Sequence, residues 1–166
     1  MKVALLMGSD SDFPRLEECV ATLKEFGVEV IARVLSAHRT PKEVVRFVET
    51  DGPQAGVQVF LCAAGGAAHL AGVVAAHTNL PVIGIPMDNP PLGGLDALLS
   101  TVQMPGGVPV ATVGAGRGGP INAALLAIRT SYAVFLRQKK HPSRFCGLAP
   151  AFQPVQAPLP PDARFL

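Results

Sequence analysis

Five short apolar runs alternate with segments of helical periodicity over about the first 138 residues, and this alternation restricts the fold more than any other feature of the chain. The runs predict strands at residues 2–7, 28–35, 57–62, 81–85 and 108–112. Because the runs are continuously apolar, we expect strands that are covered on both faces. Regular alternation of strand and helix predicts an α/β domain, with an open parallel sheet of five strands between two layers of helices.

The segments between the runs predict helices at residues 12–26, 40–49, 67–77, 92–101 and 121–138. Ser11 or Asp12 is the expected N-cap of the first helix. The second helix opens on Thr40-Pro41-Lys42-Glu43, a predicted capping box with proline at the first helical position. Prolines are frequent after His141, so we expect one α/β domain over residues 1–140 and an extended proline-rich tail over residues 141–166.

Charged residues are scarce and unevenly distributed. Asp, Glu, Lys and Arg make up 16% of the 166 residues, against roughly 25% in an average soluble domain. Between Gly52 and Gly116 the only charged side chains are those of Asp88 and Asp96. Two explanations of this neutral span stay open. Either its surface is buried against other copies of the chain, or it forms a buried parallel sheet with small-residue helices.

Several features bear on location and partners. The stretch 59–77 has about the length of a membrane span, but Gly65-Gly66 and His69 near its middle favour a strand, a turn and a helix. The apolar run at the start of the chain is too short for a signal peptide. The three cysteines are far apart and predict free thiols, so we expect a cytoplasmic protein. A net charge of +2 predicts neither nucleic acid nor a membrane as partner.

Polar or glycine-rich segments follow the first four predicted strands, at the edge of the sheet where such folds bind ligands. Residues 8–12 read Gly-Ser-Asp-Ser-Asp. A helix start at this point favours an anion, while the two acids repel a phosphate. Plain helix capping and contact with sugar hydroxyls therefore both stay open for these residues.

Residues 36–40, Ser-Ala-His-Arg-Thr, give the clearest chemical signal. An imidazole such as that of His38 both accepts and releases protons near neutral pH. Arg39 suits bidentate pairing with a phosphate. The alternative is a surface His-Arg pair at a helix start. His69, which follows a Gly-Gly-Ala turn, is either a site residue or a histidine bonded to the backbone.

The motifs of several other chemistries are missing from the sequence. The histidines and cysteines lack metal-ligand spacing, so no metal is predicted. The chain has no nucleophile elbow, no Walker loop and no dinucleotide-binding glycine motif after the first strand. Ala63 and Ala64 stand where a receiver domain carries an aspartate. These absences leave the loops after the first three strands as the candidate site.

Five segments at these loops and beyond them together resemble one family. They read MGSDSD, SAHRTP, AAGGAAHLAG, LDALLSTVQMPGGVPVATV and NAALLA, and they occur in this order. Over roughly residues 2–138 the chain is similar to the class I N5-carboxyaminoimidazole ribonucleotide mutases, the PurE family of bacterial purine synthesis. The resemblance implies a flavodoxin-like three-layer αβα sandwich with a C-terminal extension, assembled as a homo-octamer.

The resemblance also implies a reaction. These enzymes move a carboxylate from the exocyclic nitrogen of the aminoimidazole to ring carbon C4, without ATP, biotin, metal or any other cofactor. By motif, His38 shuttles the proton. The residues expected to bind the ribonucleotide are Ser9, Asp12 and Arg39, with Ser11 and Ser36 as further contacts. The residues expected to line the pocket for the base and CO2 are Gly65, Gly66, Ala67 and His69.

Two alternatives remain beside the mutase. A class II enzyme of the same family carboxylates aminoimidazole ribonucleotide directly with CO2; the GGAAHL segment and Arg39 after His38 favour class I. A non-catalytic nucleotide-binding module of the same fold is the second alternative, and it requires His38 to be dispensable. The chain departs from the family pattern at residues 86–94, at residues 114–120 and in the proline-rich tail.

Overall fold

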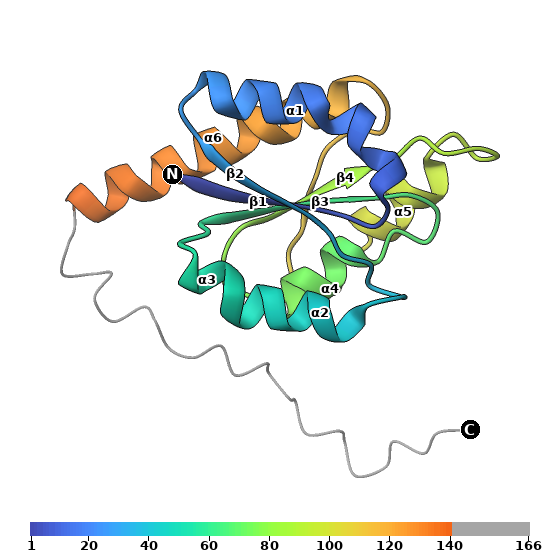
Figure 1. Cartoon of the computed structure of the whole chain (residues 1–166), viewed down its shortest axis with the longest axis horizontal. Helices are drawn as coiled ribbons and strands as arrows, with labels where there is room; N and C mark the ends of the chain where they lie inside the picture. Colours follow the sequence, from blue (N-terminus) through green and yellow to red (C-terminus); the bar gives the residue numbers. More distant parts are fainter. Residues whose placement is uncertain (141–166) are drawn as a thin grey trace, which may run out of the picture.

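A five-stranded parallel sheet with the strand order β2-β1-β3-β4-β5 forms the middle of the molecule (Figure 1). The structure, a computed structural model, describes residues 1–140, with side chains through Ser131. The strands are β1 (Lys2–Met7), β2 (Glu29–Val34), β3 (Val59–Ala64), β4 (Val82–Pro86) and β5 (Ala111–Thr112). All neighbouring strands are parallel, so the predicted α/β class is confirmed. The strand order is that of flavodoxin-like folds.

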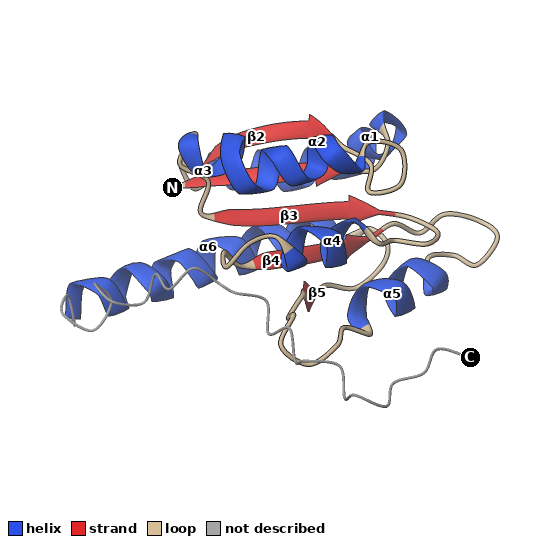
Figure 2. Cartoon of the chain, turned by 90° about the horizontal axis from the view of Figure 1, so that it is seen from below, coloured by secondary structure: helices blue, strands red, loops and turns tan. Residues whose placement is uncertain are grey.

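Helices cover both faces of the sheet. They are α1 (Phe13–Glu25), α2 (Pro41–Arg46), α3 (Gly52–Gln54), α4 (Leu70–Ala76), α5 (Leu95–Val102) and α6 (Gly118–Lys140). A 3-10 turn, η1 (Asp10–Asp12), precedes α1, and a π-helical turn, η2 (Phe47–Asp51), joins α2 to α3. Figure 1 shows α1 and α6 on one face and α2, α3 and α4 on the other. Helix α5 lies beside β5, at the edge of the sheet (Figure 2).

The alternating side chains of the inner strands fill two cores, one on each face. In β1, Leu5 packs on the same side as Leu16 of α1, whereas Leu6 packs with Val44 of α2. Strands β1, β3 and β4 are therefore buried on both faces, as their apolar runs predict. Strand β2 differs because it is an edge strand, and its Val34 is 53% exposed.

The N-cap residues were predicted correctly, Asp12 for α1 and Thr40 for α2, but their predicted capping bonds are absent and one helix end was wrong. Other local hydrogen bonds of the two side chains explain the missing capping bonds. The Thr40 side chain does not cap α2; its hydroxyl instead bonds to the backbone of Ser36. Asp12 makes no capping bond to α1, because its carboxylate pairs with Arg15. The second helix does not end at Glu49, since the helical path continues through η2 and α3.

Other predictions meet the structure only in part. Cys19 and Cys62 are free and buried, as expected; burial raises the pKa of the Cys19 thiol to about 12. No helix in the described part of the chain is long and apolar enough to cross a membrane. The predicted tail at 141–166 and Cys146 lie outside the described residues.

Candidate active site

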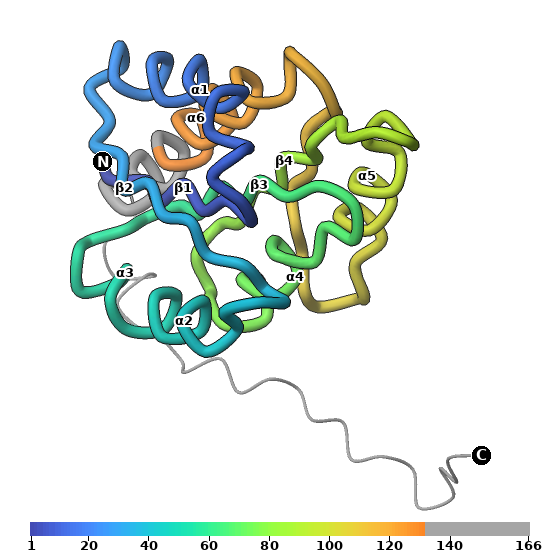
Figure 3. Tube along the Cα trace, turned by 45° about the vertical axis from the view of Figure 1, so that its right-hand side comes forward, coloured from blue at the N-terminus to red at the C-terminus, as the bar shows by residue number. Residues whose placement is uncertain are grey.

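The loops after β1, β2, β3 and β4 meet at one edge of the sheet and enclose a cavity of about 330 Å3. It lies where the strand order reverses, between β1 and β3, which is the usual ligand site of such folds. Figure 3 shows these loops converging near the carboxyl end of β3. The predicted site residues that line the cavity are Ser9, Ser11, Asp12, Ser36, His38, Arg39, Gly65, Ala67 and His69. Gly66 is the one predicted residue that does not line it.

Two histidines meet in the cavity although 31 residues separate them. Nε2 of His38 lies 2.9 Å from Nδ1 of His69, and the rings meet edge to face at 84°. His38 comes from the loop between β2 and α2, while His69 is the residue just before α4 rather than part of its first turn. One ring nitrogen donates a hydrogen to the other, so His69 fixes the orientation of the His38 imidazole. Such a pair suits proton transfer at a bound substrate.

Arg39 spans the carboxyl ends of β2 and β1. Its guanidinium donates to the carbonyl oxygen of Gly8, and its backbone N–H donates to Oγ of Ser36 at 3.2 Å. The hydroxyl of Thr40 accepts from the backbone N–H of Ser36 at 3.0 Å, which closes the loop on itself. The loop therefore holds a fixed positive charge at the mouth of the cavity, a position suited to a phosphate.

Asp12 lines the same cavity with a buried carboxyl group. The residue is 4% exposed, and its Oδ1 accepts from Arg15 at 3.0 Å. Burial raises the pKa of its carboxyl, while the charges of Arg15 and Arg39 act in the opposite direction. The hydroxyls of Ser9 and Ser11 lie 2.8 Å apart beside it. A carboxylate and two hydroxyls on one turn form a set of partners for sugar hydroxyls.

The loop after β3 gives the cavity a wall without charge. A Cβ at Gly65 would collide with the side-chain amide of Asn89, and Gly66 has a positive φ of 64°. The backbone N–H of Ala68 donates to Oγ of Ser100 in α5 at 3.0 Å. Helix α5 thus fixes the glycine turn from outside the sheet.

Asn89 and Arg15 belong to the site although no sequence motif singled them out. Asn89 lines the cavity, and its Oδ1 accepts from Nη2 of Arg15 at 2.9 Å. Arg15 reaches Asp12 and Asp88 as well. The three-residue spacing from Asp12 to Arg15 on a helix was an available signal. The described residues contain no group of three His, Cys, Asp or Glu side chains arranged to hold a metal.

Comparison with known proteins assigns the chain to a family. The family model described as AIR carboxylase matches residues 2–138. The chain belongs to the AIR carboxylase family. The chain is similar to the crystal structure of Treponema denticola PurE, with a TM-score of 0.70 and 29% sequence identity. The match covers 87% of this chain and 94% of the Treponema denticola chain, and it supports the flavodoxin-like fold.

Relatives of this AIR carboxylase family member carry a more specific name. The N5-carboxyaminoimidazole ribonucleotide mutase of Saccharolobus solfataricus is 54% identical over 77% of this chain and 79% of its own length. The mutase of Mycobacterium tuberculosis strain H37Rv is 52% identical over 77% and 72%. The mutase of Bacillus subtilis strain 168 is 49% identical over 75% and 76%. The PurE-family resemblance of the sequence is therefore confirmed.

Proposed function

We propose that the chain converts N5-carboxyaminoimidazole ribonucleotide to 4-carboxyaminoimidazole ribonucleotide, an isomerisation in purine synthesis that uses no ATP. Relatives that are 49% to 54% identical over about three quarters of the chain carry the name of this mutase. The single structural observation that carries the proposal is the convergence of His38, Arg39 and Asp12 on one cavity with an uncharged wall. A proton carrier, a phosphate partner and a sugar partner are the groups that this reaction needs.

The reaction moves one carboxylate and one proton in opposite directions. The bond between the carbamate carbon and the exocyclic nitrogen breaks, and CO2 is released into the cavity. Ring carbon C4 attacks the CO2, a C–C bond forms, and the proton of C4 ends on the exocyclic nitrogen. His38 carries that proton, and the same imidazole returns it, so no further acid or base is needed.

The walls of the cavity divide the substrate contacts between them. Arg39 pairs with the phosphate, with Ser36 beside it, and Asp12 binds the ribose hydroxyls, with Ser9 and Ser11 as further contacts. Gly65, Ala67 and His69 border the base and the CO2, and Gly66 holds the turn. An uncharged wall favours a neutral gas over water, which slows the escape of CO2.

The test of this proposal is a pair of incubations without ATP, followed by ultraviolet absorbance. We expect 4-carboxyaminoimidazole ribonucleotide to form from the N5-carboxylated substrate. Product formed only from aminoimidazole ribonucleotide and bicarbonate contradicts the mutase and favours the direct carboxylase. No product from either mixture, with ribonucleotide binding retained, favours the non-catalytic binding module.

We also propose that the enzyme works as a homo-oligomer, an octamer as in the resembling family, in the cytoplasm. Leu92 precedes α5, and Leu95, Leu99 and Val102 lie along it; all four are about half exposed, at 48% to 58%. His38 and His69 are also exposed in the single chain. A neighbouring copy that covers α5 buries this apolar surface, which isolated subunits rarely present. Sedimentation is expected to give a species far above 17 kDa, and a stable monomer contradicts the assembly.

A further inference from the structure

One guanidinium joins two parts of the candidate site that lie far apart in the sequence. Nη2 of Arg15 donates to Oδ1 of Asp12 at 3.0 Å and to Oδ1 of Asn89 at 2.9 Å, while Nη1 donates to Oδ1 of Asp88 at 3.0 Å. Asp12 belongs to the turn before α1, whereas Asp88 and Asn89 belong to the loop after β4. No other hydrogen bond of a described side chain connects these two loops.

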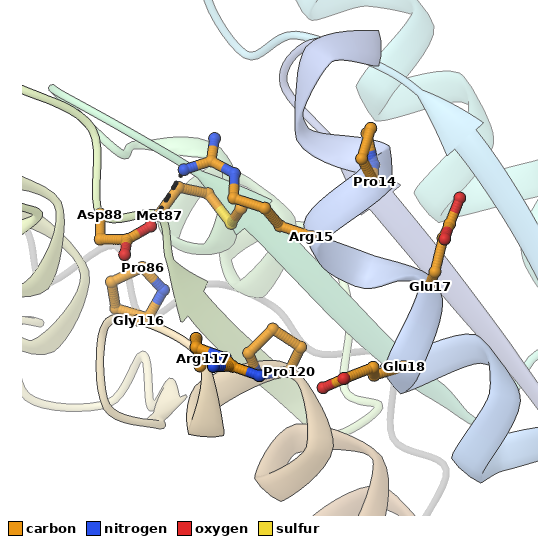
Figure 4. Close-up of a pocket in the computed structure, with 10 residues that line it drawn as sticks. All are labelled: Pro14, Arg15, Glu17, Glu18, Pro86, Met87, Asp88, Gly116, Arg117 and Pro120. Atoms are coloured by element: carbon orange, nitrogen blue, oxygen red, sulfur yellow. Dashed lines mark hydrogen bonds and ion pairs between the residues drawn. The ribbon is translucent and has the colours of Figure 1, made fainter.

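Arg15 does not line the candidate active-site cavity, although two of its three partners do. Asp12 and Asn89 border the candidate active site, and Arg15 does not. Arg15 and Asp88 instead border a second cavity of about 290 Å3 between α1 and the start of α6. Figure 4 shows the Arg15 side chain extending from α1 to Asp88 along this second cavity. Arg15 therefore borders the second cavity and contacts the active-site cavity only through Asp12 and Asn89.

We propose that Arg15 is a positioning residue for the reaction proposed above, which holds Asp12 against the ribose and Asn89 against the glycine turn. This inference rests on the proposed function and extends it. The planar guanidinium supplies separate N–H groups in a fixed fork, so one side chain satisfies three acceptors at once. A lysine at this position carries the same charge but lacks the planar arrangement of N–H donors.

Asn89 is held between two constraints, and Arg15 supplies one of them. The side-chain amide of Asn89 lies where a Cβ of residue 65 would be, so it packs directly on Gly65. The backbone of the loop is tied to β3 by the Met87 N–H, which donates to the carbonyl of Ala64 at 2.9 Å. Without Arg15 the amide loses its partner at Oδ1, and the cavity widens on the side of the base.

Asp12 depends on Arg15 in a second way. Burial favours its neutral form, whereas the charge and the hydrogen bond of Arg15 favour the carboxylate, with a smaller contribution from the charge of Arg39. The other titratable groups around it are Asp10 on its own turn, His38 and His69 across the cavity, and Asp88 beyond Arg15. Removal of Arg15 therefore raises the pKa of the Asp12 carboxyl further, and it releases the side chain from the position in which it is proposed to bind the ribose.

The test compares Arg15→Met and Arg15→Lys with Arg117→Met. Arg117 lines the same second cavity but is not among the residues of the active-site cavity (Figure 4). We expect Arg15→Met to raise KM at least tenfold with kcat changed less than threefold, because Asp12 is proposed to bind the ribose and Asn89 packs on the glycine turn, and neither residue carries the proton. Arg15→Lys recovers part of the loss, and Arg117→Met keeps the wild-type KM. Adding Asn89→Ala to Arg15→Met has little further effect.

A second measurement keeps this inference separate from the proposed function. Carbon-detected NMR titration of the aspartate carboxyls is expected to give a higher Asp12 pKa in Arg15→Met than in the wild type or Arg117→Met. If the wild type fails to turn over substrate, the proposed function is wrong, and the titration still decides the role of Arg15. An unchanged Asp12 pKa in Arg15→Met overturns the inference. A fall in kcat with an unchanged KM also overturns it, because that is the result expected when the variant merely contains less folded enzyme.

Discussion

Residues 1–51 and residues 52–116 build opposite walls of the same cavity with opposite chemistry. The first region holds nine of the twelve acidic residues and supplies Asp12, His38 and Arg39. The second has Asp88 and Asp96 as its only charged residues and supplies the turn at Gly65. In the proposed reaction the charged wall binds the ribonucleotide, and the uncharged wall borders the neutral CO2.

The outer surfaces of the two regions also differ in charge. The first region exposes charged pairs such as Arg46 with Glu43. The second exposes the leucines of α5, whose inner side bonds to the glycine turn through Ser100. The neutral span therefore forms buried strands and also leaves an apolar surface uncovered. The buried sheet accounts for the low charge of β3 and β4. Burial of α5 against another copy stays a proposal, and it would account for the rest of the span.

The largest expected effect comes from charging the apolar surface of α5. Leu95→Glu with Leu99→Glu places two unpaired charges in the proposed contact, and each buried unpaired charge costs about 3 kcal/mol or more. We expect association to weaken by about 10⁴-fold, measured by sedimentation. Phe26→Glu charges an exposed apolar residue of the first region and is expected to leave the assembly intact. Equal behaviour of the two variants contradicts the contrast between the regions.

His38→Asn tests the charged wall at its chemical centre. Removal of a general acid–base group lowers kcat by about 10²- to 10⁴-fold, while the phosphate and ribose contacts remain. We expect turnover to be lost and ribonucleotide binding, measured by calorimetry, to stay near the wild-type value. His77→Asn is the control, since His77 pairs with Glu49 away from the cavity. Full activity of His38→Asn removes this residue from the mechanism.

Arg39→Met tests the phosphate contact of the same wall. A hydrogen bond to a charged group contributes about 1.5–3 kcal/mol, so KM is expected to rise roughly 10- to 100-fold. Arg33→Met, on the exposed edge strand β2, removes an equal charge without touching the cavity. If both variants raise KM alike, the effect is one of overall charge, and the assignment of Arg39 to the phosphate is wrong.

Gly65→Ala tests the uncharged wall with the smallest change. The added methyl meets the Asn89 amide, and overpacking costs typically about 1–3 kcal/mol. We expect kcat/KM to fall about tenfold, with partial recovery when Asn89→Gly makes room. Gly106→Ala adds the same methyl where nothing lies within 4 Å, and it is expected to leave kcat/KM unchanged. If Gly65→Ala also leaves kcat/KM unchanged, the uncharged wall does not shape the site.

The sequence predicted the sheet and most of the cavity for physical reasons. Continuous apolar runs identify buried strands, and parallel strands end at one edge, so His38, Arg39 and Gly65 were placed together without a structure. The capping bonds were less predictable than the N-cap positions, because the side chains of Thr40 and Asp12 bond to other nearby partners, Ser36 and Arg15. The contacts of Arg15 with Asp88 and Asn89 were not predictable, because these residues are 73 and 74 positions away and no local pattern indicates such a contact.

The fate of the transferred carboxylate gives the most direct test of the proposed reaction. The purified enzyme is given N5-carboxyaminoimidazole ribonucleotide labelled with carbon-13 in the carboxylate, in buffer with unlabelled bicarbonate and no ATP. If CO2 stays in the cavity between the two walls, the C4 carboxylate of the product retains the label. Product that carries the unlabelled carbon of the buffer contradicts the account, since the enzyme then takes CO2 from solution.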